Sequence, residues 1–229
     1  MASPLDLQEQ EQLDALKAFW KQYGNLITWL LVAALTAYAG LNAWRWWQRD
    51  QAVKAGAMFD QLELAAAAGD AQRAGQIFAD LKERYARTAY AQQGGLVAAR
   101  AQFDKGQIDA ATASLTWVAD NASEDEYKTI ARLRLAGLLL QAKNHDAALK
   151  QLDLARAPTF EALVADRRGD VLLAQGKPEQ AREAYMAAWK AMDERLEYRR
   201  LIDAKLVALG ASPQAPAGSA SAAASGPAP

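Results

Sequence analysis

Residues 23–44 read YGNLITWLLVAALTAYAGLNAW and contain no charged side chain. An apolar run of about 20 residues is long enough to cross the hydrocarbon core of a bilayer as a helix. Aromatic residues, whose rings favour the headgroup region, stand near both ends of the run: Trp20, Tyr23, Trp44, Trp46 and Trp47. The sequence therefore predicts one transmembrane helix over 23–47, preceded by a short amphipathic segment over 1–22.

Two other interpretations of this run exist. A core helix of a soluble fold explains neither its length nor the aromatic residues at both ends. A cleaved secretory signal would use Lys17 and Lys21 as its positive region and residues 37–39, Ala-Tyr-Ala, as its cleavage site. Against cleavage, the preceding segment is long and acidic, and the apolar run continues beyond Ala39. Cleavage stays open as an alternative that the intact mass of the mature protein would decide.

Positive charges near the run give little information on orientation. Lys17 and Lys21 precede it, whereas Arg45, Arg49 and Lys54 follow it. Lys and Arg are enriched on the cytoplasmic side of membrane spans. Taken alone, this difference of one residue leans toward a cytoplasmic location for the large C-terminal part.

Composition argues against several classes of function. The chain has 27 Asp plus Glu against 26 Lys plus Arg, no cysteine and one histidine, His145. Balanced charge argues against nucleic acid as the main partner, and one histidine without cysteine cannot build a usual zinc site. No phosphate-binding loop or nucleophile motif is present. We therefore expect a protein that is not an enzyme and uses no cofactor or metal.

Residues 211–229 contain only Ala, Ser, Pro, Gly and Gln, which predicts a disordered tail.

Between the membrane run and the tail, a pattern repeats four times. Each unit has a short turn followed by an alanine, at Ala74, Ala111, Ala148 and Ala181, with spacings of 37, 37 and 33 residues. Four residues beyond each alanine lies a large side chain: Phe78, Leu115, Leu152 or Tyr185. Twelve residues before each alanine, in the preceding helical stretch, lies Leu62, Ala99, Ala136 or Gly169. Small residues at such positions let two helices approach closely.

This periodicity resembles the tetratricopeptide repeat, a helix–turn–helix unit of about 34 residues, although the early tryptophan of that family is absent. The resemblance implies an all-α fold over 48–210: a right-handed solenoid of about four helix pairs with a C-terminal capping helix. We expect helices at 51–68, 70–85, 89–104, 107–119, 124–142, 145–156, 159–175, 178–192 and 194–209. Ser123 and Glu126 predict a capping box at the start of the fifth helix. Leu196, Leu201, Leu206 and Leu209 predict the buried stripe of the capping helix.

Tetratricopeptide solenoids bind partners along the face built from the first helix of each pair. The repeat register predicts that the following residues line this groove: Phe59, Leu96, Arg100, Phe103, Ile130, Leu133, Leu140, Leu163, Asp166, Asp170 and Leu173. Such an apolar groove suits an extended apolar segment or a partner helix. Because Arg100 is the only cation among them, a carboxylate-binding clamp is not expected. For each residue, a plain core role is the competing interpretation, and Asp166 with Asp170 reads as a solvated acidic face.

The membrane helix offers a second predicted contact surface. Ala33, Thr36, Ala37 and Gly40 follow the i, i+3, i+4, i+7 spacing of one helical stripe. In lipid, stripes of small residues allow close helix packing. Chance in an alanine-rich chain is the alternative explanation.

Three segments together resemble the YfgM family of ancillary SecYEG translocon subunits. They are residues 12–24, QLDALKAFWKQYG, then Trp44-Arg45-Trp46-Trp47, and residues 202–206, IDAKL. The resemblance covers nearly the whole chain except the tail. It implies a protein of the inner membrane with a cytoplasmic N-terminus and a periplasmic repeat domain, opposite to the charge count. It also implies association with Sec translocon subunits, with a PpiD-type periplasmic chaperone and with nascent secretory proteins.

The functional hypothesis is therefore a non-enzymatic, membrane-anchored scaffold at the Sec translocon. It would help periplasmic and outer-membrane proteins leave the channel together with a membrane-anchored chaperone. The alternative is a regulatory adaptor of the envelope that sequesters a signalling or envelope-assembly protein.

Overall fold

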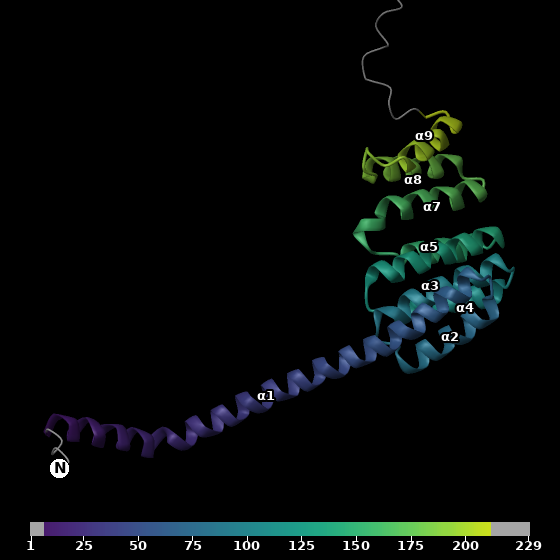
Figure 1. Cartoon of the computed structure of the whole chain (residues 1–229). Coiled ribbons are helices and arrows are strands. Elements are labelled where there is room, and N and C mark those ends of the chain that lie inside the picture. The colour runs from purple at the N-terminus through teal and green to yellow at the C-terminus, as the bar shows by residue number, and fades with distance from the viewer. Residues whose placement is uncertain (1–6, 212–229) are drawn as a thin grey trace, which may run out of the picture. The chain divides into compact units, whose positions relative to one another are not determined.

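The computed structural model describes residues 7–211, and all regular elements in that range are helical. In chain order they are α1 (Leu7–Ala67), α2 (Ala71–Arg84), α3 (Ala89–Asp104), α4 (Ile108–Asn121), α5 (Asp125–Gln141), α6 (His145–Asp153), the short 3₁₀ helix η1 (Pro158–Phe160), α7 (Glu161–Ala174), α8 (Pro178–Ala191) and α9 (Tyr198–Ala208) (Figure 1). The predicted helices from residue 70 onward are confirmed to within four residues at each end. Apart from Ala211, the predicted tail lies outside the described residues.

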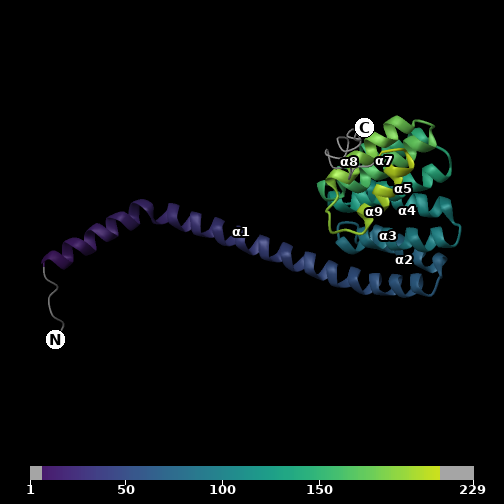
Figure 2. The same ribbon diagram turned by 90° about the horizontal axis from the view of Figure 1, so that it is seen from above.

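The transmembrane prediction and the first predicted repeat helix fall on one continuous helix, α1 (Figure 2). Residues 45–55 contain neither glycine nor proline. Nothing in this segment therefore ends a helix, and the predicted break between 47 and 51 does not occur. By internal contacts the chain divides into two units, one ending at Val53 and one beginning at Lys54. Each unit is described by itself below.

In the N-terminal unit, the structure describes residues 7–53 of α1, which include the apolar run. This segment contains a window of mean hydropathy 1.6, of which none is buried within the protein. A core helix of a soluble protein would be mostly buried, so this exposure argues against the soluble-core interpretation. Aromatic side chains pair near both ends of the apolar run: the ring centroids of Phe19 and Tyr23 are 5.1 Å apart, and those of Trp44 and Trp47 are 5.3 Å apart.

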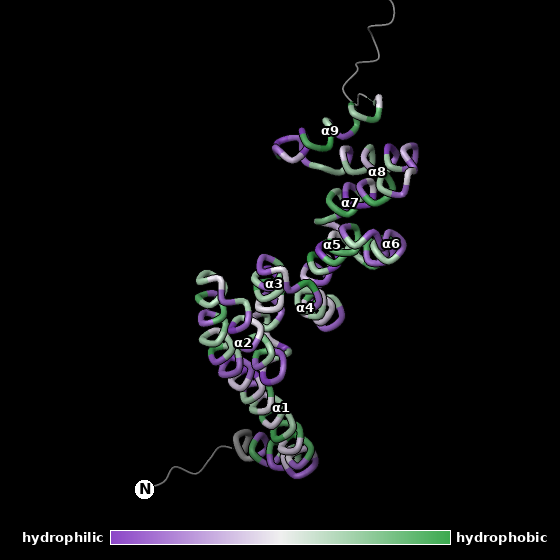
Figure 3. Tube along the Cα trace, turned by 90° about the vertical axis from the view of Figure 1, so that its right-hand side faces the viewer, coloured by the Kyte–Doolittle hydropathy of each residue, from purple (hydrophilic) through white to green (hydrophobic). Residues whose placement is uncertain are grey.

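The C-terminal unit is a stack of helix pairs. Each helix from α2 to α9 packs against the next, and α3, α5 and α7, the first helices of successive pairs, also contact one another in turn. Figure 1 shows these helices layered in chain order, and Figure 3 shows α6 beside its pair partner α5. The end of α1 provides the first helix of the first pair, because Leu62 shares a core with Phe78 and Leu81 of α2.

The repeated small residues lie where the helices of each pair cross. Ala74, Ala111, Ala148 and Ala181 are all fully buried. The large residues four positions later are at most 3% exposed. At Gly169, an added Cβ atom would lie 2.4 Å from Cε1 of Tyr185, too close for any real contact. The helix pairs therefore depend on small residues at these crossings.

The turns within the four pairs share one backbone conformation. Gly69, Gly106 and Gly176 have φ of 71°, 72° and 74°, and Lys143 occupies the same place with φ of 58°. The backbone N–H groups of Lys143 and the following Asn144 donate to the carbonyls of Leu140 and Leu139 at 3.0 and 2.8 Å. This is the hydrogen-bond pattern that closes a helix with a left-handed residue. The repeat at residue 143 therefore keeps the turn of the others without a glycine.

One local prediction was wrong and another was correct only in part. Ser123 does not cap α5: its Oγ accepts a hydrogen bond from Nε2 of Gln92 at 3.0 Å, and the N-cap of α5 is Glu124, without a side-chain bond. In α9, Leu201 is 48% exposed, as Leu196 before the helix is 51% exposed, while Ile202 and Leu206 are fully buried. The predicted stripe is therefore confirmed at Leu206 and at Leu209, which packs partly buried against the same core, and is wrong at Leu196 and Leu201, where Ile202 takes the buried place.

Replacing Gly169 with alanine tests the crossing geometry. The new methyl group would displace the ring of Tyr185, which is 1% exposed. We expect the free energy of unfolding to fall by about 1–3 kcal/mol, as for other overpacked cores. Denaturant titration of the full chain in detergent, followed by circular dichroism, measures this change.

Gly137→Ala is the matched control, because its Cβ would meet only Nη1 of Arg167, at 3.9 Å. It should leave stability unchanged or raise it by up to about 1 kcal/mol through helix propensity. Equal effects of the two substitutions would show that Gly169 is not needed for close packing.

Candidate partner groove

A hollow of about 470 Å³ opens among α3, α4, α5 and α7. Its lining residues are Ala99, Arg100, Phe103, Ala111, Leu115, Leu133, Arg134, Gly137, Leu138, Leu140, Gln141 and Arg167. Four predicted groove residues are among them: Arg100, Phe103, Leu133 and Leu140. Their side chains converge because the first helices of successive pairs lie next to each other. This space is called the central hollow below.

The remaining predicted groove residues lie elsewhere. Leu96 is 8% exposed and lines a smaller neighbouring hollow of about 260 Å³, which also includes Arg100 and Arg134. Phe59 is buried, with its ring centroid 5.7 Å from that of Tyr90. Ile130 and Leu163 pack at the edges of core clusters, and Leu173 is 42% exposed. The central hollow is thus smaller than the predicted groove.

Three guanidinium groups border the central hollow. Arg100 lies 2.8 Å from a carboxylate oxygen of Asp104, and both side chains are exposed. Arg134 donates from Nη1 to the carbonyl of Leu96 at 2.9 Å. Arg167 lies 3.7 Å from Oδ2 of Asp170. Partial enclosure, and secondarily the charge of Arg100, lower the pKa of Arg134. An arginine nevertheless stays cationic at neutral pH.

Sequence reasoning recognised Arg100 but missed Arg134 and Arg167. These two arginines occupy the same repeat position, two residues before Ala136 and Gly169 respectively. Recurrence of one charge at one repeat position was a signal that could have identified them. The groove was expected to contain one cation, Arg100, but the central hollow is lined by three arginines.

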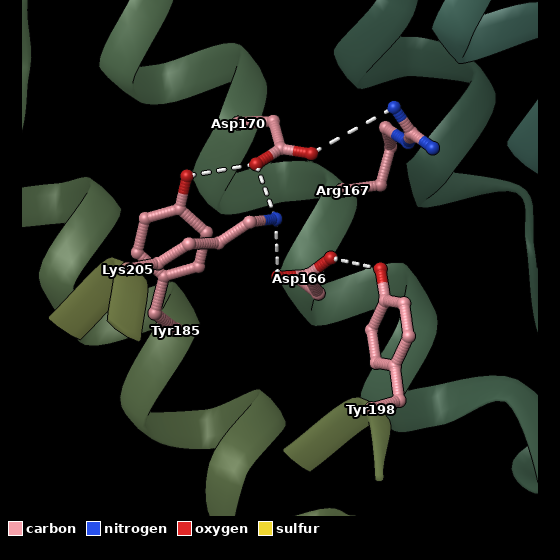
Figure 4. Close-up of polar contacts among 6 residues, drawn as sticks. All are labelled: Asp166, Arg167, Asp170, Tyr185, Tyr198 and Lys205. Carbon is pink, nitrogen blue, oxygen red and sulfur yellow. Dashed lines mark hydrogen bonds and ion pairs between the residues drawn. The ribbon is translucent and has the colours of Figure 1, made fainter. Parts of the chain in front are cut away.

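Asp166 and Asp170 lie in a polar cluster closed by the C-terminal helix (Figure 4). Nζ of Lys205 in α9 lies 2.8 Å from Oδ1 of Asp166 and 2.7 Å from Oδ1 of Asp170. The hydroxyl of Tyr198 donates to Asp166 and that of Tyr185 donates to Asp170, both at 2.8 Å. Asp166 is only 2% exposed. Both carboxylates thus serve to bind α9, and their interpretation as a solvated acidic face was wrong.

The two tyrosines of this cluster resist ionisation. Burial raises the pKa of Tyr185 above its usual value, and the hydrogen bond to Asp170 adds to the shift. The pKa of Tyr198 is raised by burial and by its bond to Asp166. Both phenols therefore remain hydrogen-bond donors throughout the neutral range. Sequence reasoning missed Lys205 because its partners lie 39 and 35 residues away.

A larger hollow of about 650 Å³ lies between α8 and α9. It is lined by Trp189, Glu194, Arg195, Leu196, Glu197, Arg199, Arg200 and Asp203. Its three arginines are matched by three carboxylates, and two ion pairs of 3.0 Å neutralise part of the charge: Arg199 with Glu194 and Arg200 with Glu197. The guanidinium of Arg199 also lies 3.9 Å from the Trp189 ring centroid. The charge of this hollow is therefore partly neutralised by its own ion pairs, while Nε of Arg199 and Oδ1 of Asp203 are buried without a hydrogen-bond partner in the described part of the chain.

Residues 17–211 match the tetratricopeptide repeat-like domain family. The chain is 32% identical to the ancillary SecYEG translocon subunit of Neisseria gonorrhoeae, over 89% of this chain and 98% of that protein. The chain belongs to this family. It is also 31% identical to the Escherichia coli subunit of the same name, over 80% of this chain and 88% of that protein, and 28% identical to that of Haemophilus influenzae, over 80% and 89%. The predicted resemblance is thereby confirmed.

In this family member, the predicted stripe on the apolar part of α1 is exposed along its length. The hydroxyl of Thr36 donates to the carbonyl of Val32 at 2.8 Å, so this polar group is satisfied within its own helix. An added Cβ at Gly40 would contact nothing within 4 Å. The packing role of Ala33, Thr36, Ala37 and Gly40 stays a prediction.

Lys205→Met tests the polar attachment of α9. The substitution would leave Asp166 buried without its cation, and breaking a buried ion pair costs about 3–5 kcal/mol. Because Lys205 is partly exposed, we expect a loss nearer about 2 kcal/mol. Faster amide hydrogen exchange in α9 than in α3 would locate this loss.

Arg200→Met removes a cation from the same helix, but its ion pair with Glu197 is more than 80% exposed on both sides. It should change stability by less than about 0.5 kcal/mol. Equal exchange rates in the two variants would contradict a special role for Lys205.

Proposed function

We propose that this chain is a non-enzymatic scaffold anchored in the inner membrane beside the Sec translocon. The observation that carries the proposal is family membership over nearly the whole chain, because the curated relatives bear the name of translocon subunits. Helix stacks of this class present continuous surfaces to partners. The central hollow offers such a surface, lined by apolar side chains together with three arginines.

The proposed topology places the N-terminal segment in the cytoplasm and the repeat domain in the periplasm, with α1 uncleaved. The apolar window of α1 has no partner within the protein, which supports burial in lipid. The one-residue excess of positive charge after the run opposes this orientation. Family membership outweighs that bias, because a short N-terminal segment can stay in the cytoplasm without being translocated.

In this arrangement the anchor holds the repeat domain at the channel exit. The central hollow receives a segment of a membrane-anchored, PpiD-type periplasmic chaperone or of an emerging secretory chain. Periplasmic and outer-membrane proteins would thereby leave the channel with a chaperone already close by. The protein contributes position and binding, and no chemical step is assigned to it.

Cysteine labelling tests the topology, because the natural chain contains no cysteine. Glu11→Cys and Gln107→Cys lie at exposed positions on opposite sides of the apolar run. In cells with a permeabilised outer membrane, an impermeant maleimide should label the variant at residue 107 and leave the variant at residue 11 unlabelled. The reverse pattern would place the repeat domain in the cytoplasm, and a mature mass lacking the apolar run would reveal cleavage.

Photo-crosslinking in cells tests the groove. A photoreactive amino acid at Phe103 or Leu133, both in the central hollow, should crosslink to translocon subunits, a PpiD-type chaperone or nascent secretory chains. Leu154, which is 48% exposed and lies outside that hollow, is the control position and should give no such products.

The products identified by mass spectrometry distinguish the two functional hypotheses. Crosslinks from Phe103 and Leu133 to a signalling or envelope-assembly protein alone would favour the regulatory adaptor. If Phe103 and Leu133 gave the same crosslinked products as Leu154, the central hollow would not be a binding surface.

A further inference from the structure

The central hollow carries positive charge that the protein itself neutralises only in part. Its lining includes Arg100, Arg134 and Arg167, and among the residues that the structure describes no Asp or Glu lines it. Asp104 pairs with Arg100 from the border of the neighbouring hollow. Carboxylates therefore approach this space only at its edge.

Arg134 is the least compensated of the three cations. Within residues 7–211, its polar contact is with the carbonyl of Leu96, an uncharged acceptor. Partial desolvation and the nearby charge of Arg100 both lower the pKa of Arg134, although its side chain is still exposed and accessible to a ligand. An anion bound beside Arg134 would be favoured, because opposite charges favour each other's ionised forms.

Arg167 is also incompletely paired. Its carboxylate neighbour Asp170 lies 3.7 Å away and also binds Lys205 and the hydroxyl of Tyr185 at 2.7 and 2.8 Å. One carboxylate thus serves two cations, and the closer one is Lys205. Arg167 keeps donors available for a ligand, because a guanidinium carries five N–H groups.

Apolar side chains also line the central hollow. They are Phe103, Leu115, Leu133, Leu138 and Leu140, with small residues between them. A free inorganic anion or a nucleic-acid backbone would leave this area uncovered. The combination suits a ligand that carries apolar side chains and carboxylates together.

We propose that the central hollow binds an acidic, apolar peptide segment, whose Glu or Asp side chains pair with Arg134 and Arg167 while its apolar side chains cover Phe103 and Leu133. This inference rests on the proposed function, since it describes the segment that the groove receives. On this proposal, the affinity of the hollow for a segment depends on the charge of the segment as well as on its apolar side chains. Of two equally apolar segments, the acidic one binds more tightly. A groove with apolar residues alone would not distinguish an acidic segment from an uncharged one.

Matched peptide sets test this proposal on the full chain in zwitterionic lipid nanodiscs. Each 12-residue fluorescent peptide contains four Leu or Phe and three Glu in shuffled order, and a second set replaces every Glu with Gln. By fluorescence anisotropy, and after subtracting binding to empty nanodiscs, the best Glu peptides should bind about tenfold more tightly than their Gln partners. Raising salt from 0.05 to 0.5 M should reduce this ratio, because screening weakens partly exposed ion pairs.

Variants show whether the preference comes from the proposed residues. Arg134→Gln and Arg167→Gln should each reduce the Glu-to-Gln ratio at least threefold and leave the affinity of the Gln peptides unchanged. Arg73→Gln removes the same charge from an exposed position on α2 outside the central hollow and should leave the ratio intact. Circular dichroism confirms that each variant is folded.

Failure of this inference can be told apart from failure of the proposed function. If the Glu and Gln peptides bound equally well and Leu133→Asp abolished the binding of both, the groove would bind peptides without distinguishing their charge. This result would overturn the inference alone. No peptide binding, together with no crosslinks above the Leu154 control, would overturn the proposed function as well.

Loss of the preference on adding anionic lipid would identify a lipid headgroup as the occupant. Dimerisation abolished by Arg134→Gln would identify a second copy. Either result overturns the peptide proposal.

Discussion

The repeat domain depends on the close approach of paired helices at small residues. Ala74, Ala111, Ala148 and Ala181 are fully buried at the crossings. A side chain added at Gly169 would meet the ring of Tyr185 at 2.4 Å. Because each pair is this tight, the large side chains that follow can fill the space against the next pair. A change at one crossing therefore alters the stacking of the next layer and the shape of the hollow between first helices.

The C-terminal end of the stack is closed differently. Ile202 and Leu206 bury apolar area, but the inward face of α9 also carries Lys205, which binds two carboxylates of α7. A purely apolar cap could slide or rotate with little penalty. The lysine and the tyrosine hydroxyls can form their bonds in only one register. This requirement agrees with a register that buries Ile202 and Leu206 and leaves Leu201 exposed.

Most of the fold could be predicted from the sequence because its determinants are local and periodic. Helix-forming residues, turns with glycine and one alanine per unit identified four helix pairs, and even the Lys143 turn was placed correctly. Contacts between distant residues could not be read in the same way. Gln92 takes Ser123 away from its expected capping role, and Lys205 finds Asp166 39 residues earlier. The site was predicted in part for the same reason: Arg100, Phe103, Leu133 and Leu140 follow the repeat register, whereas Phe59 and Asp166 satisfy contacts within the domain.

Arg167 connects the polar cluster at the end of the stack to the candidate site, because it lines the central hollow and lies 3.7 Å from Oδ2 of Asp170. Asp170 binds Lys205 and Tyr185 at short distances, which leaves Arg167 as its more distant partner at 3.7 Å. Both short bonds use Oδ1 of Asp170, whereas Arg167 faces Oδ2, so one carboxylate divides its charge among three partners and neutralises Arg167 only in part. Arg167 therefore keeps N–H donors at the lining of the hollow, and the residue that borders the C-terminal cluster also contributes to the charge preference proposed for the groove.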